Sequence, residues 1–164
     1  MKHLETYLSF ILGAERFAVN VMQVLEVLQK QPVTILPNAP DSIVGVINFR
    51  GDIVPVYNFR NIFNFPKLVD DKKLAIIIFS ISTENETTNV AAATDAVKDV
   101  LEINDDEIKP LPQFGYHFNP EFIKGIFMRD NVSYLILDVN KVFDIVELNA
   151  VAEQLQTSNN EINS

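Results

Sequence analysis

The sequence predicts a mainly β protein built from two similar small barrels, with short helices. One observation is that β-branched and aromatic residues occur in short runs separated by turn residues, which is typical of strands joined by tight turns. The other is that apolar, proline and glycine positions of one half of the chain recur in the other half. Each copy of roughly 70 residues holds several short strands, which suits a closed barrel that hides its strand edges.

Hairpins account for most of the expected strands. The clearest joins 43–49 to 53–59 through Arg50-Gly51-Asp52, where Gly51 can take the positive φ of a tight turn. Two further hairpins are expected, one from 7–12 and 16–20 and the other from 122–128 and 132–138. Residues 74–81 and 99–103 are the remaining expected strands, and the first is interpreted as buried because Leu74 to Phe79 are all apolar.

Two short helices are also expected. The first begins at Val21 behind Asn20 as its N-cap, because apolar residues recur three, four and seven positions later. The same segment could equally start a strand at Val27, which is β-branched. The second helix is expected over Asn140–Val146.

The internal repeat relates specific positions. Pro40, Ile43, Gly45, Val46, Val56, Asn58, Ile62 and Phe63 correspond, 80 residues later, to Pro120, Ile123, Gly125, Ile126, Ile136, Asp138, Val142 and Phe143. Upstream, Val24, Glu26, Val27, Ile35 and Pro37 correspond, 73 residues later, to Val97, Asp99, Val100, Ile108 and Pro110. A longer loop at 111–119 accounts for the change of offset. Unrelated hairpins would not share paired proline and glycine positions, so the halves are interpreted as copies of one fold.

Composition excludes several function classes. The chain has 22 acidic and 13 basic residues and a formal net charge of -9, so its surface should repel nucleic acid. It has no cysteine, which excludes disulfides, a thiolate nucleophile and metal–thiolate sites. Its longest apolar run, 74–79, is far shorter than the roughly 20 residues of a membrane-spanning helix, and no secretory signal is evident. A cytoplasmic protein without membrane insertion is expected.

Catalytic signatures are largely missing. The glycines stand alone, so no phosphate-binding loop is present, and His3 and His117 have no second ligand at metal-binding spacing. No enzymatic activity, metal or cofactor is therefore expected. The alternative is an enzyme with an acidic site around Asp95, Asp99 and Asp138, although each of these is better interpreted as a turn former or helix cap.

Several segments carry a family resemblance. They include TILPNAP (34–40), GVINFRGDIVPVYNFR (45–60) and LILDVNKV (135–142), together with 17–19, 24–27, 94–100 and 122–126. In this order and spacing the chain resembles the CheW-type coupling proteins of bacterial chemotaxis over about 6–147. The resemblance implies two five-stranded SH3-like barrels and no catalysis. It also implies two partners, the cytoplasmic tip of a chemoreceptor and the regulatory domain of the chemotaxis histidine kinase. The chain itself would be a monomer or associate weakly in rings.

The resemblance also suggests partner-binding residues, within a CheW-like domain at 1–148 that precedes a polar tail at 149–164. Val24, Glu26, Arg50 and Gly51 match family positions tied to coupling, and Gly45 belongs to the same motif. Val24, Val27, Ile35 and Val46 are candidates for an apolar groove that takes a receptor helix, with burial in the core as the alternative for each.

Two questions stay open at this point. One is whether Glu26 pairs with Arg50 at the junction of the barrels or is merely exposed. The other is which array the protein serves, because the same adaptor could work in a pilus or surface-motility array. Gene neighbourhood would separate that array from flagellar chemotaxis.

Overall fold

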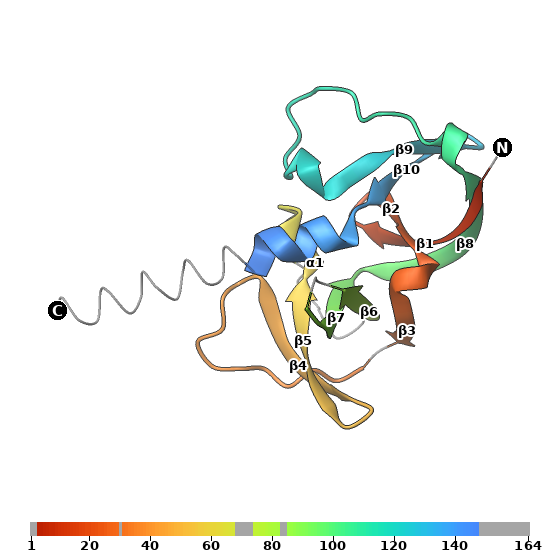
Figure 1. The fold of residues 1–164 in the computed structure, drawn as a ribbon. Coiled ribbons are helices and arrows are strands. Elements are labelled where there is room, and N and C mark those ends of the chain that lie inside the picture. Colours follow the sequence, from red (N-terminus) through yellow and green to blue (C-terminus); the bar gives the residue numbers. More distant parts are fainter. Residues whose placement is uncertain (1–2, 30, 68–73, 83–84, 148–164) are drawn as a thin grey trace.

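The computed structural model of the protein describes residues 3–29, 31–67, 74–82 and 85–147. These residues form ten strands arranged in two five-stranded sheets, which confirms the predicted mainly β fold. Figure 1 shows the two sheets on either side of a helix, drawn in blue, that covers residues 139–147. The predicted tail at 149–164 lies outside the described residues.

One sheet is built from the middle of the chain and is called the middle sheet. Its strand order is β3-β6-β7-β5-β4. The bounds are β3 Val24–Gln29, β4 Ile43–Phe49, β5 Asp52–Asn58, β6 Ala75–Ser82 and β7 Thr87–Thr94. The short helix α1, Phe59–Ile62, follows β5.

The other sheet combines the two ends of the described chain and is called the terminal sheet. Its order is β8-β1-β2-β10-β9. The bounds are β1 Leu4–Leu12, β2 Glu15–Asn20, β8 Ala96–Asn104, β9 Ile123–Arg129 and β10 Val132–Leu137. Three single 3₁₀ turns lie between strands: η1 Val21–Gln23, η2 Asp105–Glu107 and η3 Pro120–Phe122.

The two strand orders correspond element by element. Written side by side, β3-β6-β7-β5-β4 matches β8-β1-β2-β10-β9, and each sheet has one parallel pair in the same place, β5 with β7 and β10 with β2. The chain therefore starts in the terminal sheet, crosses to the middle sheet after β2, and returns after β7. The first two strands complete a sheet whose other three strands come from the end of the described chain.

In the middle sheet, the segment that follows β3 reaches the opposite edge. Thr34 exchanges two backbone hydrogen bonds with Val46 of β4, each 2.9 Å long. A Cβ atom at Gly45 would lie 2.1 Å from the Thr34 carbonyl oxygen. Only glycine permits this approach, so the bridge that curls the sheet depends on Gly45.

The terminal sheet repeats this arrangement. Lys109, after β8, exchanges backbone hydrogen bonds of 2.9 and 2.8 Å with Ile126 of β9. A Cβ atom at Gly125 would lie 2.5 Å from the Lys109 carbonyl oxygen. Gly45 and Gly125 of the sequence repeat are thus glycines for the same physical reason. The bridges make Thr34 equivalent to Lys109, however, whereas the sequence alignment that paired Ile35 with Ile108 would place Thr34 two residues earlier, at 107.

The largest apolar core lies between the two sheets rather than inside either of them. Side chains of β6 show how it forms, because Ile77 and Phe79 face this shared core while Ile76 and Ile78 face the core of the middle sheet alone. The run 74–79 is apolar throughout since both faces of its strand are buried. The helix at 139–147 adds Val142 and Phe143 to the shared core.

The expected helix beginning at Val21 is wrong. Asn20 does cap a helical turn, accepting a 2.9 Å hydrogen bond from the Met22 backbone N–H, but this turn is η1 and ends at Gln23. From Val24 the chain is strand β3, because pairing with β6 satisfies its backbone and lets Val24 and Leu28 reach different cores. The strand at Thr87–Thr94 was not expected either.

The glycine contacts give a direct stability test. Gly45→Ala should lower the free energy of unfolding by about 2 kcal/mol or more, because its methyl group would overlap a backbone oxygen that cannot move aside. Gly115→Ala is the matched control, since a Cβ there meets no atom within 4 Å. Urea unfolding followed by circular dichroism measures both. Equal midpoints for the two variants would contradict the proposed role of the bridge.

Candidate functional site

The structure gathers the predicted partner-binding residues in one half of the molecule. All lie in the middle sheet or beside it: Val24, Glu26 and Val27 on β3, Ile35 after β3, Gly45 and Val46 on β4, and Arg50 and Gly51 in the β4–β5 turn. Sequence reasoning therefore selected a spatially connected set. Their binding role remains a prediction.

The β4–β5 turn holds Arg50 in a defined position. Arg50 and Gly51 have φ values of 53° and 88°, the pair of positive values that a two-residue type I′ turn requires. The Gly51 N–H donates to Asn48 Oδ1 at 3.2 Å, and the Arg50 guanidinium lies 4.7 Å from the centroid of the Phe49 ring. The turn thus presents a cation that stacks on an aromatic ring at the tip of a hairpin.

Glu26 and Arg50 do approach each other, but not at the junction of the sheets. Arg50 Nη2 lies 3.9 Å from Glu26 Oε2, and the two side chains are 69% and 43% exposed. Both residues belong to the middle sheet, so the pair does not join the two halves. An exposed pair of this kind contributes about 0 to 1 kcal/mol.

The apolar candidates divide into buried and exposed residues. Val24 and Val27 are half-buried against the shared core, and Val46 is half-buried on β4. Ile35 is 67% exposed and lines a groove of about 530 Å³ together with Leu36 and Phe65. Of the four groove candidates, Ile35 is the one whose side chain is mainly available to a partner.

Ile53 is a second exposed apolar residue of the middle sheet, and sequence reasoning missed it. It lies on β5 next to the Arg50 turn and is also 67% exposed. The alternation of the strand could have indicated this exposure. Val54 and Val56 point into the core of the middle sheet, so Ile53 lies on the opposite face of the strand. We call Ile35, Ile53, Glu26, Arg50 and Gly51 the hairpin surface.

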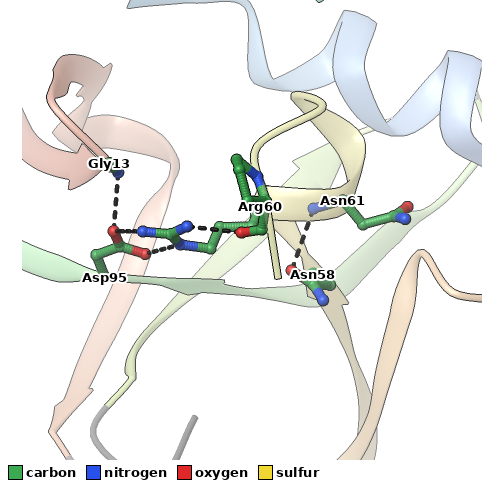
Figure 2. A network of polar contacts seen from close by, with 6 residues as sticks. Gly13, Asn58, Arg60, Asn61 and Asp95 are labelled. Carbon is green, nitrogen blue, oxygen red and sulfur yellow. Dashed lines mark hydrogen bonds and ion pairs between the residues drawn. The ribbon is translucent and has the colours of Figure 1, made fainter. Parts of the chain in front are cut away.

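A largely buried ion pair, which sequence reasoning also missed, connects the two halves. Arg60 of α1 donates from Nε to Asp95 Oδ1 at 2.7 Å and from Nη2 to Asp95 Oδ2 at 2.5 Å (Figure 2). The two side chains are 14% and 17% exposed, and the hydrogen bonds to Asp95 raise the pKa of Arg60. Such two-pronged pairs fix geometry as well as charge.

The surroundings of the pair come from both sheets. Asp95 Oδ2 also accepts a 2.8 Å hydrogen bond from the Gly13 N–H in the β1–β2 turn, and Arg60 Nη1 donates to the Pro66 carbonyl oxygen at 2.7 Å (Figure 2). The Asn58 side chain accepts from the Asn61 N–H and starts the helical turn that aims Arg60 inward. We call Arg60, Asp95 and Gly13 the clamp.

The three acids of the alternative acidic site have different surroundings. Asp95 is engaged in the clamp, whereas Asp99 is exposed on β8 and Asp138 accepts from the Lys141 N–H at the start of the helix at 139–147. Within the described ranges, no group of three or more acidic or histidine side chains is arranged to hold a metal ion. None of the helices in this part of the chain is long and apolar enough to cross a membrane.

Comparison with known proteins identifies the family. The model of the CheW-like domain matches residues 6–147. The chain belongs to the CheW-like family. The chemotaxis protein CheW of Rhizobium meliloti (strain 1021) is 28% identical over 143 residues, covering 87% of this chain and 90% of the relative. That of Bacillus subtilis (strain 168) is 28% identical over 142 residues, covering 85% and 87%.

A solved structure agrees with this assignment. The scaffolding protein TtCheW from Thermoanaerobacter tengcongensis has a TM-score of 0.74 and 28% sequence identity, covering 86% of this chain and 88% of that one. The resemblance drawn from the sequence segments is thereby confirmed, as is the CheW-like fold.

The two ion pairs should differ sharply in their effect on stability. Arg60→Ala should lower the free energy of unfolding by about 3 kcal/mol, because it leaves the Asp95 carboxylate largely buried without its cation. Arg50→Ala should change it by less than about 1 kcal/mol. Urea unfolding of the two variants beside the parent protein compares them. A smaller loss for Arg60→Ala than for Arg50→Ala would mean that the burial of the clamp does not govern its contribution.

Proposed function

We propose that this CheW-like protein is a non-enzymatic cytoplasmic adaptor that couples the cytoplasmic tips of chemoreceptors to the regulatory domain of a chemotaxis histidine kinase. Its family supports the proposal, since the matching relatives are chemotaxis proteins and the similar solved structure is a scaffolding protein. Two of the three acids of the alternative site have structural contacts instead, Asp95 in the clamp and Asp138 at a helix start.

The main structural support for the proposal is the combination of side chains on the hairpin surface. It places the exposed apolar side chains Ile35 and Ile53 in the same half as the charged pair Glu26 and Arg50. Apolar side chains supply the binding free energy when a partner covers them, and charges at the rim select the partner. A rigid turn loses little conformational entropy on binding, so Arg50 is well suited to selecting that partner.

Charge reversal at the turn tests this assignment. Arg50→Glu should weaken binding of a receptor cytoplasmic fragment or of the kinase regulatory domain at least about tenfold, because it replaces the cation that selects the partner and repels Glu26. Isothermal titration calorimetry with each purified partner measures the dissociation constants.

Lys124→Glu is the matched control for this experiment. Lys124 is exposed on β9 of the terminal sheet, so the substitution makes the same change of charge on the other sheet from the hairpin surface. Its dissociation constants should stay within about threefold of the parent values. Unchanged binding of Arg50→Glu to both partners would remove the hairpin surface from the proposal, and failure of the parent protein to bind either partner would remove the adaptor function itself.

A further inference from the structure

The chain crosses between the two sheets at two places that the repeat makes equivalent. The first crossing runs from β2 to β3 through η1, and the second runs from β7 to β8 through Asp95 alone. Near each crossing lies the start of a helix, and the residue 80 positions after Arg60 is Asn140. The duplicated fold would by itself place equivalent contacts at both crossings.

The contacts at the crossings are nevertheless very different. At the first, Gln23 Nε2 donates a single exposed hydrogen bond of 3.2 Å to Asn140 Oδ1. At the second, Asp95 holds Arg60 with two charged hydrogen bonds, accepts a third from the Gly13 N–H, and donates its own backbone N–H to the Ile11 carbonyl oxygen. The polar contact at the first crossing is thus an exposed neutral bond, whereas the second crossing has a largely buried network.

The difference between the contacts at the two crossings matters for the orientation of one sheet relative to the other. The shared apolar core and an exposed 2.6 Å hydrogen bond from Asn64 Nδ2 to the His117 carbonyl oxygen also join the two halves, but burial of apolar area is non-directional. A two-pronged guanidinium–carboxylate contact, in contrast, allows only a narrow range of angles. Figure 2 shows that this contact joins α1 of the middle half to the β1–β2 turn of the terminal sheet through Asp95.

We propose that Arg60 and Asp95 are positioning residues that fix the orientation of the middle sheet relative to the terminal sheet. The hairpin surface belongs to the middle sheet, so the clamp sets where that surface lies with respect to the other half. A partner that contacts both halves at once would then depend on the clamp, while a partner that contacts one half would not. This last consequence rests on the proposed adaptor function.

Distance measurement between the halves tests the proposal directly. The chain has no native cysteine, so Ile53→Cys and Met128→Cys introduce one spin label on an exposed position of each sheet. Pulsed electron–electron double resonance then reports the distribution of distances between the labels. The labelled protein should give one narrow distribution, and Asp95→Asn should broaden it because the neutral amide cannot hold the Arg60 fork.

Glu107→Gln is the matched control, since it also converts a carboxylate to an amide but acts on an ion pair with Arg129, 3.6 Å long, inside the terminal half. Its distribution should remain narrow. Arg60→Lys is a second clamp variant, which keeps the positive charge but loses the paired hydrogen bonds of the guanidinium. It replaces Asp95→Asn as the test if circular dichroism and gel filtration show that Asp95→Asn is not folded. A parent-like distribution in the folded clamp variants would overturn the proposal.

A binding readout separates the clamp from the adaptor function. Folded clamp variants should still bind a receptor fragment or the kinase regulatory domain singly, but should lose receptor-controlled phosphorylation in the reconstituted three-protein assembly. If the parent protein shows no such control, the adaptor function fails while the distance result still stands. If clamp variants broaden the distances and yet support full control, positioning is unrelated to coupling.

Discussion

The structure depends on the apolar core that the two sheets share. Neither sheet could bury its outer apolar face alone, and the aromatic contacts that close this face come from both halves, such as Phe17 with Phe63 at 5.0 Å and Tyr57 with Phe143 at 5.2 Å between ring centroids. The helix at 139–147 completes the core. This arrangement buries both faces of some strands, and it explains why the first five residues of β6, 75–79, are all apolar.

A shared core also explains where polar contacts matter. Charged side chains on the hairpin surface are free to serve recognition because stability does not rest on them. Where the chain passes between the sheets, a charge is largely removed from water and must be paired, which is why Asp95 meets both a guanidinium and a backbone N–H. The same residue type therefore has different roles at the tip of a hairpin and at a crossing.

Sequence patterns predicted the features that arise locally. The β4–β5 hairpin was predictable from Arg50-Gly51, and the repeat from glycines that a backbone bridge requires. The failures concern long-range choices. Val21 to Leu28 has helical spacing, but most of this segment is a strand because it pairs with β6. The strand Thr87–Thr94 was not predicted because it lacks large apolar residues, and its alanines pack between two cores. The clamp was invisible because Arg60 and Asp95 are 35 residues apart and only the fold brings them together.

The two copies of the fold show which residues the shared architecture requires and which it leaves free to differ. Gly45 and Gly125 are the same residue because both sheets need the same close approach. The β9–β10 turn has the backbone form of the β4–β5 turn, with φ values of 53° and 63°, yet it carries Asp130 where the other turn carries Arg50. The two turns have the same backbone form but carry opposite charges. A partner would therefore distinguish the two hairpin tips by their side chains. A protein with two copies of one architecture can in this way keep a stable fold and still offer two different surfaces.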